Sequence, residues 1–429
     1  MLQTLRNAWK VKELRNKILF TIFIIIVFRI GSVITVPYID ADALRASMTG
    51  EGANQFFSYL SILTGGGLEY GAIFAMSVTP YINASIIVQL LCVAIPYLER
   101  LSKEGEEGQK KLATITRFVT VVLALIQAVA YFFYLNGSGM LTVNKGGATV
   151  FAAFVIVLAL TAGSALVMWL GEQIDVKGIG NGISMLLFAG ILSRGPQAFD
   201  ALRANWANHK LAVIAIVLIF LLVIAFIVWI TNAERRIPIQ YAKRVVGNKM
   251  YGGQNTHIPI KVNMSGVMPI IFASSILMLP TMILSFTGTH TVDTVPSWQK
   301  GLALFSTQGA FYAIIYFVLI IAFAYFYSTI QFNPVEMANN LRKNGGAIPG
   351  IRPGNPTSDF ISKILSRITL LGALFLSVIA ILPILVGNIG GMNISLGGTS
   401  VLIMVGVALD TVQNLESQMM MRHYKGFLD

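Results

Sequence analysis

The sequence of 429 residues is 55% hydrophobic and only 12% charged, with a mean hydropathy of +0.72. Soluble domains carry about 25% charged residues, so this composition excludes an ordinary soluble protein and predicts one that crosses a membrane many times. A net charge of +12 would suit a nucleic-acid-binding protein, but the basic residues are concentrated between long apolar runs. One cysteine, Cys92, four scattered histidines and the lack of a nucleotide-binding motif predict no cofactor, no metal and no enzymatic activity.

Ten runs of mostly apolar residues are long enough, at about 17 residues or more, to cross a bilayer as helices. The first is predicted to be a membrane helix and not a cleaved signal peptide, because no small-residue cleavage site follows it. The sequence thus predicts an all-α polytopic membrane protein with ten transmembrane helices. They cover residues 18–36, 72–95, 112–135, 150–170, 178–194, 211–230, 266–286, 309–330, 364–386 and 398–415.

Two stretches in different halves of the chain resemble each other at a separation of 189 residues (267 − 78 = 189). The match has no gap and keeps a proline in register, which favours an internal repeat over chance similarity between apolar helices. With five spans in each half, the second copy enters the membrane in the opposite direction, and such inverted repeats place the working site midway through the membrane. The matched pairs are Val78 and Val267, Pro80 and Pro269, Ile82 and Ile271, Ala84 and Ala273, Ser85 and Ser274, and Ile87 and Ile276.

The distribution of Lys and Arg predicts the topology. Basic residues are concentrated in 1–17, 96–111, 231–265 and 331–363, whereas 387–397 has none. The positive-inside rule then places both termini and the basic segments in the cytoplasm of a multi-pass plasma-membrane protein. The predicted organisation is a cytoplasmic N-terminal segment (1–17), a first half (18–194), an external hinge loop (195–210), a second half (211–415) with cytoplasmic loops 231–265 and 331–363, and a cytoplasmic tail (416–429).

The segment 56–68 between the first two spans is apolar, too short to cross a membrane, and ends in a glycine triplet. A half-helix of this kind can fold into a cavity lined by protein, where non-helical backbone is tolerated. An amphipathic turn lying on the membrane surface is the alternative. The residues concerned are Phe57, Tyr59, Leu60, Ile62, Leu63, Gly65, Gly66 and Gly67.

Two of the basic segments carry strand and turn signals. Residues 234–244 and 256–263 alternate apolar with polar side chains on either side of glycines, which predicts a β-hairpin. Residues 345–354 form a tight Gly/Pro loop that we expect to lie beside it. Together they suit an anionic partner, either RNA phosphate or an acidic protein surface, and charge that only sets topology is the alternative. The docking candidates are Arg235, Arg236, Lys243, Arg244, Lys249 and Arg352.

The predicted spans hold few ionisable residues, unlike those of ion-coupled carriers. Arg29 lies close to the outer boundary, so snorkelling to the membrane surface is the simplest interpretation. The repeated helices supply bulky aliphatic residues instead, namely Val78, Ile82 and Ile271. A ring of them would block ions, because removing an ion's water costs on the order of tens of kcal/mol before relaxation. It could still stretch around an extended polypeptide, and ordinary helix packing is the alternative.

Several motifs resemble the SecY family of bacterial protein-conducting channels, from the first span to the last. The departures are Ser77, where that family usually has Gly, and Asp175, where it usually has Ser, Thr or Asn. The similar segments are 72–91, 169–187, 241–244, 254–257, 261–263, 349–354 and 397–400.

The resemblance implies two halves that open like a clamshell, pass unfolded secretory polypeptides, and release membrane segments sideways through a lateral gate. It makes 56–68 a plug and adds three residues to a pore ring of Val78, Ile82, Ile183, Leu187, Ile271 and Ile403. The lateral gate would run between 72–95 and 112–135 on one side and 266–286 and 309–330 on the other, with Asn83, Ser85, Gln127 and Ser274 along it. The implied partners are SecE, SecG, the SecA motor ATPase, the ribosome, signal sequences, preproteins and membrane lipid.

A secondary transporter with inverted repeats is the alternative function. It predicts a compact polar site at the midplane and short cytoplasmic loops, and the sequence shows neither. A purely structural scaffold is a third possibility, and it predicts that substitutions in the ring have no effect.

Overall fold

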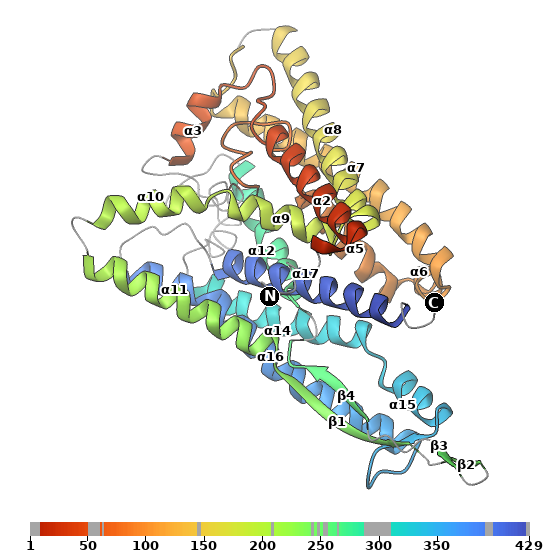
Figure 1. Ribbon diagram of the computed structural model, residues 1–429. Helices are drawn as coiled ribbons and strands as arrows, with labels where there is room; N and C mark the ends of the chain where they lie inside the picture. The colour runs from red at the N-terminus through yellow and green to blue at the C-terminus, as the bar shows by residue number, and fades with distance from the viewer. Residues whose placement is uncertain are drawn as a thin grey trace.

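The computed structural model describes residues 9–49, 61, 64–143, 147–206, 210–241, 244–246, 249–251, 256–263, 266–286, 310–390 and 398–425. These residues are mostly helical, with short strands in two of the connections (Figure 1). The first half contains α2 (Lys12–Gly31), α3 (Ala41–Thr49), α5 (Thr79–Ala94), α6 (Pro96–Lys103), α7 (Glu106–Gly137), α8 (Gly147–Lys177) and α9 (Gly182–Leu192). The second half contains α11 (Lys210–Thr231), α12 (Met268–Phe286), α14 (Ala310–Gln331), α15 (Pro334–Lys343), α16 (Asn355–Gly390) and α17 (Gly398–Lys425).

Each of the ten predicted apolar windows contains one helix, in the order α2, α5, α7, α8, α9, α11, α12, α14, α16 and α17. Within the described residues, five helical stretches are long and apolar enough by themselves to cross a membrane. The pair α5 and α6, bent by 104°, makes a sixth when it is counted as one span. The others are short, as α9 is with 11 residues, or less apolar, so they depend on their neighbours in the bundle.

The helices of each half pack mainly against one another. In the first half α7 lies between α5 and α8, and α8 also contacts α9; in the second half α14 lies between α12 and α16, and α16 contacts α17. Within the described residues, the main helix contacts between the halves are those of α9 with α17 and of α12 with α5 and α7. The largest apolar cluster of the described residues spans both halves.

The second apolar window, 72–95, is helical only from Thr79 onwards. Gly71 and Ser77 have left-handed φ angles of 54° and 48°, which a right-handed helix cannot contain. Pro80 then lies in the first turn of α5, where its missing N–H costs no hydrogen bond. The chain before α5 is therefore a series of buried turns, and such backbone is tolerated in a membrane protein when protein surrounds it.

The predicted β-hairpin is confirmed. β1 (Glu234–Tyr241) pairs antiparallel with β4 (Thr256–Lys261), and the short strands β2 (Arg244–Val246) and β3 (Lys249–Tyr251) pair beyond it. The buried Ile237 and Ile239 of β1 alternate with exposed neighbours, as expected for a half-buried strand. They pack against Ile361 and Leu365 of α16, so the sheet is mounted on the first turns of that helix.

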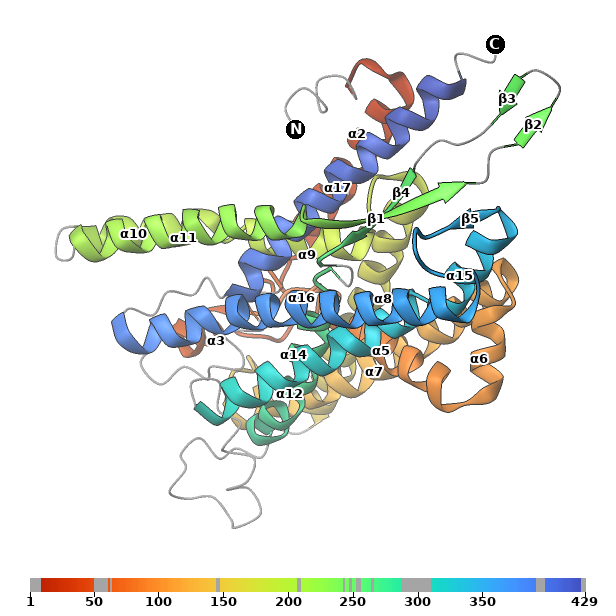
Figure 2. The same ribbon diagram turned by 90° about the horizontal axis from the view of Figure 1, so that it is seen from below.

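The two basic connections lie side by side, as predicted. β5 (Gly346–Ala347) pairs with β1 on the edge opposite β4, with Gln240 opposite Ala347, giving the strand order β4-β1-β5. This pairing fixes the 345–354 loop beside the hairpin (Figure 2).

The connection 195–210, predicted as a loop, contains the helix α10 (Gly195–Trp206). A proline at its second position and the Ala and Leu residues after it favour a helix, which outweighs the turn signal of Gly195. α10 packs against α11, and the two project together from the rest of the bundle (Figure 1).

The two ends of the described chain lie on the same side of the bundle (Figure 2). Leu14 of α2, Ile179 and Leu415 of α17 share a small apolar cluster. The Lys17 Nζ donates a hydrogen bond to Gln418 Oε1 at 3.2 Å. An even number of membrane crossings between α2 and α17 accounts for this arrangement.

Candidate pore

The six aliphatic residues predicted to form the ring lie in one large apolar cluster, which holds many other residues as well. Four of them are buried and two are half-buried against the cluster. They come from both halves of the chain, and the ring itself stays a prediction. Val78 and Ile82 belong to the start of α5, Ile183 and Leu187 to α9, Ile271 to α12 and Ile403 to α17.

Ile183 is distinguished from the others by its contact with α8. A β-carbon added to Gly171 of α8 would come within 2.6 Å of Ile183 Cδ1, and one added to Gly182 would come within 2.0 Å of the Gly171 carbonyl oxygen. These glycines let α8 and α9 approach closely. Part of the Ile183 side chain therefore faces α8, and α9 is held firmly in place beside it.

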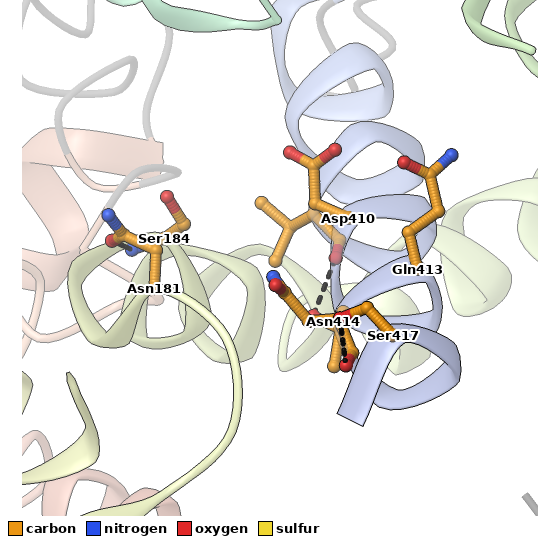
Figure 3. A pocket seen from close by; sticks show the side chains of 8 residues that line it. Asn181, Ser184, Asp410, Gln413, Asn414 and Ser417 are labelled. Carbon is orange, nitrogen blue, oxygen red and sulfur yellow. Dashed lines mark hydrogen bonds between the residues drawn. The ribbon is translucent and has the colours of Figure 1, made fainter. Parts of the chain in front are cut away.

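A polar cavity of about 410 Å³ adjoins the cluster, between α9 and α17 (Figure 3). On α9, Ser184 precedes Leu187 by three residues, and on α17, Val407 follows Ile403 by four. Residues three or four apart share a helix face, so the cavity begins one turn from the apolar residues on both helices. It is lined by Asn181, Ser184, Val407, Asp410, Thr411, Gln413, Asn414 and Ser417.

The cavity lies on the side of the bundle that carries the hairpin. Lys261, the last residue of β4, donates from Nζ to Gln413 Oε1 at 2.5 Å, and Gln413 Nε2 donates to Asn232 Oδ1 at 3.5 Å. Asp410 lies near the end of the last apolar window, where an end-of-helix charge is the simplest interpretation, and its place in this lining was not predicted. The recurrence of polar residues at helical spacing from Asp410 through Asn414 to Ser417 is the signal that could have found it.

The predicted plug is described only in part. Ser61 and Thr64 are completely buried at 0% exposure. Gly65 and Gly66 have left-handed φ angles of 66° and 91°, which glycine adopts without strain and which account for two of the three glycines in the triplet. Phe57, Tyr59, Leu60, Ile62 and Leu63 lie outside the described residues.

The structure corrects the interpretation of Arg29. Its guanidinium turns into the protein, and Nη1 donates to the carbonyl oxygen of Gly65 at 2.9 Å. A carbonyl in a left-handed turn has no helical N–H to accept from, so a charged donor satisfies it well. This contact joins segments 36 residues apart, and no local pattern in the sequence indicates it.

The predicted lateral-gate residues lie on helices that meet at the boundary between the halves. Asn83 and Ser85 on α5 and Gln127 on α7 are half-buried, and Ser274 on α12 is buried. Ser274 Oγ donates to the carbonyl oxygen of Ile271 at 2.9 Å. Ser85 Oγ accepts from Gln89 Nε2 at 3.2 Å. Both serine hydroxyls therefore bond within their own helices and leave the boundary between α12 and α5 free of these hydrogen bonds.

The residues predicted to dock a partner lie on the sheet and its extension. Arg235 and Arg236 are exposed on β1, and Arg352 is exposed in the loop after β5. Arg236 Nε also contacts Glu234 Oε1 at 2.7 Å, which is a surface ion pair of small energetic weight. Arg244 and Lys249 belong to β2 and β3, whereas Lys243 is outside the described residues.

Both departures from the family pattern have structural consequences. Ser77 is 2% exposed with a left-handed φ, and its hydroxyl has no hydrogen-bond partner in the described part of the chain. Asp175 instead forms a useful contact, because its Oδ1 accepts from the Gly182 N–H at 2.7 Å and closes the turn between α8 and α9.

A helical bundle of two related halves, in which an apolar cluster shared by both halves adjoins a polar cavity, fits a polytopic membrane protein of the channel class. Residues 72–412 match the SecY family model. The chain is 44% identical over 432 residues to the protein translocase subunit SecY of Thermotoga maritima, covering all of this chain and 98% of that one. It is 45% identical over 442 residues to the Bacillus subtilis counterpart, with both chains covered completely. The chain belongs to the SecY family.

Solved structures confirm the predicted fold class of ten transmembrane helices in two halves. A structure described as that of a protein-conducting channel has a TM-score of 0.64 at 17% identity, covering 94% of this chain and 92% of that one. The channel chain of a canine ribosome–channel complex from the endoplasmic reticulum has a TM-score of 0.60 at 16% identity, with the same coverage.

Proposed function

We propose that this chain is the channel through which unfolded secretory polypeptides cross the plasma membrane, and that membrane segments leave it sideways into lipid. The observation that carries this proposal is the apolar cluster contributed by both halves, with a polar cavity one helical turn away. Membership of the SecY family supports it, because the relatives reported above are translocase subunits. No feature of the described residues favours a secondary transporter.

The apolar ring would act as an elastic seal. A hydrated ion finds no polar partner there, so the cost of removing its water, on the order of tens of kcal/mol before relaxation, keeps it out. An extended polypeptide displaces the aliphatic side chains and plugs the opening that it makes. The polar cavity on the hairpin side would receive the chain while it is still hydrated.

Lateral release would occur where α12 contacts α5 and α7. Each leucine of a signal sequence favours lipid by about 0.3–0.6 kcal/mol, so ten of them contribute only a few kcal/mol. That amount shifts an opening equilibrium only when its two states are already close in free energy. Helices that meet through apolar contacts, with their serine hydroxyls bonded internally, are suited to such a balance.

The docking face and orientation follow from charge. The basic sheet, with exposed Arg235, Arg236 and Arg352, would lie in the cytoplasm together with both termini and bind the SecA motor or the ribosome. One structural relative was described in a complex with a ribosome, which supports the second of these partners. SecE and SecG would be companion subunits, and the energy for transport would come from the docked partner.

A crosslinking experiment tests the proposal. A preprotein arrested during transport should crosslink to a photoreactive group placed at Ile82, Ile271 or Ile403, because all three would surround it. Leu158 on α8 is the matched control, since it is apolar but 51% exposed on the outside of the bundle. Crosslinks at Leu158 equal to those at the ring would contradict the proposal.

A transport assay separates the proposed channel from the transporter alternative. Reconstituted vesicles supplied with SecA and ATP should take up a presecretory protein if the chain is a polypeptide channel, whereas a secondary transporter predicts no polypeptide uptake.

A further inference from the structure

A buried polar cluster lies beside the glycine triplet. Arg194, at the end of α9, forms an ion pair with Glu69, and the two side chains are only 12% and 11% exposed. Arg194 Nη2 also donates to Ser61 Oγ at 2.6 Å, and Ser61 Oγ donates to Glu69 Oε1 at 2.9 Å. These three side chains form a closed triangle of contacts between the end of α9 and both sides of the glycine turn.

A second attachment holds the turn from the other side. The Gly65 carbonyl oxygen accepts from Arg29 Nη1 of α2 at 2.9 Å and from Ser193 Oγ at 3.4 Å. A β-carbon on Gly65 would lie 2.8 Å from the Arg29 guanidinium and 2.8 Å from the Gly190 backbone. The glycine turn is thus seated between α2 and α9 without spare room, and two arginines hold it there.

A buried ion pair is suited to hold a segment, here the glycine turn, that must later be released. A buried ion pair is a poor device for stability alone, because apolar residues of the same volume often stabilise a fold equally well. Removing one partner from such a pair is costly while the site is dry. Once water reaches both charges their attraction falls to a small value. A contact of this kind is strong in the closed state and weak after it opens.

We propose that Glu69, Arg194, Ser61 and Arg29 form an outer latch that positions the glycine turn in the closed channel. The latch also determines which signal sequences are accepted, because its strength sets how much binding free energy a signal must supply to open the seam. This inference rests on the proposed function of the chain as a polypeptide channel. Its new content is the identity of the residues that hold the closed state.

The first test measures ion leakage through the full chain, purified with its companion subunits and reconstituted in planar bilayers. Glu69→Gln and Arg194→Met should each raise the resting conductance at least about tenfold, because each leaves one charge buried without its partner. The exchanged pair, Glu69→Arg with Arg194→Glu, should recover most of the seal, since it restores the attraction.

Two other ion pairs provide matched controls. Glu99→Gln makes the same change in the pair with Lys103, which is 50% and 74% exposed. Arg117→Met makes the same change in the Arg117–Glu172 pair, which joins α7 to α8. Both variants should conduct like the unmodified channel. A control that leaks as much as the latch variants would overturn the proposal, since the effect would then be general to ion pairs.

The second test separates a latch from a merely structural contact. Shortening a signal sequence by three leucines should lower transport by the unmodified channel roughly 5- to 20-fold. Latch variants should transport this weakened substrate several-fold better relative to the full-length one. A folding defect would instead lower both substrates equally, and that result would overturn the proposal.

The outcomes also separate this inference from the proposed function. Folded latch variants with unchanged conductance and signal preference would overturn the latch alone, provided that the ring variant Ile82→Gly leaks. Failure of the unmodified channel to transport any preprotein would instead overturn the proposed function, together with the latch that rests on it.

Discussion

The two copies of the internal repeat begin with the same backbone and then diverge in their surroundings. α5 starts at Thr79 and α12 at Met268, and 268 − 79 = 189, the separation found in the sequence. The residues two positions before each helix, Ser77 and Gly266, have left-handed φ angles of 48° and 60°. Each copy therefore enters its helix through the same kind of turn.

The side chains that follow are different. Tyr81 and Asn83 of α5 are half-buried, whereas their counterparts in α12, Ile270 and Phe272, are 0% and 2% exposed. Phe272 packs edge-on against Phe323 of α14, with ring centroids 5.8 Å apart. The two copies thus share the position at which the helix starts, while the surface that packs against neighbouring helices differs between them. The first copy keeps polar groups that an opening seam could hydrate.

The largest effect is expected from breaking the ring in both copies at once. Ile82→Gly combined with Ile271→Gly should produce a steady ion current in planar bilayers, larger than that of either single variant. The physical reason is that the aliphatic side chains from both halves are removed from one constriction. Leu158→Gly, at a lipid-facing position, is the control for the helix-weakening effect of glycine. If the double variant conducts no more ions than the unmodified channel, the prediction that these residues form a sealing ring is contradicted.

The next effect concerns the close contacts that hold the two entry turns. A β-carbon on Gly163 of α8 would lie 2.0 Å from the Ile73 carbonyl oxygen, whereas one on Gly406 of α17 would lie 2.7 Å from Val267 Cγ1. Backbone cannot move aside as a side chain can, so Gly163→Ala should destabilise the protein by about 2 kcal/mol or more. Gly406→Ala should change stability by less than about 1 kcal/mol, because alanine favours the helix.

Thermal unfolding of the two purified variants measures this difference. Equal melting temperatures would show that the two entry turns are held equally firmly. That result would contradict the proposed difference in packing between the two copies of the repeat.

A smaller effect is expected from exchanging the residues in the entry turns. Ser77→Gly should stabilise the protein by about 1 kcal/mol, since it relieves a left-handed serine and removes a buried, unpartnered hydroxyl. Gly266→Ala should destabilise it by about 1 kcal/mol through conformation alone, because no atom of the described residues lies within 4 Å of the added carbon. Denaturation midpoints of both variants check the signs, and the same sign for both would refute this account of the turns.

The smallest effect is expected at the paired serines. Ser274→Ala and Ser85→Ala should each change stability by less than about 0.5 kcal/mol, because each hydroxyl bonds within its own helix. Their effect should appear in function instead, as a change of about twofold in the rate at which a preprotein opens the seam. A loss of more than about 2 kcal/mol at Ser274 would indicate a hydrogen bond across the boundary, which the described residues do not form in this structure.

The features that were predictable from the sequence are those written in short stretches. Apolar windows and the alternation in β1 and β4 each depend on residues close together in the chain, and the repeat was found by comparing one short stretch with another 189 residues away. The start of α5 at Thr79 was also within reach, because Pro80 favours the first turn of a helix. The helix α10 was not predicted, because its first two residues, Gly195 and Pro196, are typical of turns and 195–210 was interpreted as a loop.

The contacts that Arg194 and Arg29 make around the glycine turn could not be predicted from the sequence, for a physical reason. Arg194 and Glu69 are 125 residues apart, and neither belongs to a pattern that points to the other. Arg29 looked like a surface arginine because its distance from the end of a span was the only available information. Such contacts are created by the packing of helices, so they emerge only when the bundle has been assembled.

The length of α16 has a mechanical consequence. Its 36 residues extend over about 54 Å at about 1.5 Å per residue, whereas the hydrocarbon layer is about 30 Å thick. Its first turns carry the sheet through Ile361 and Leu365, and the rest runs into the bundle beside α14 and α17. Force applied to the sheet by a bound molecule would therefore be transmitted along α16 to the helices inside the bilayer, which that molecule need not contact.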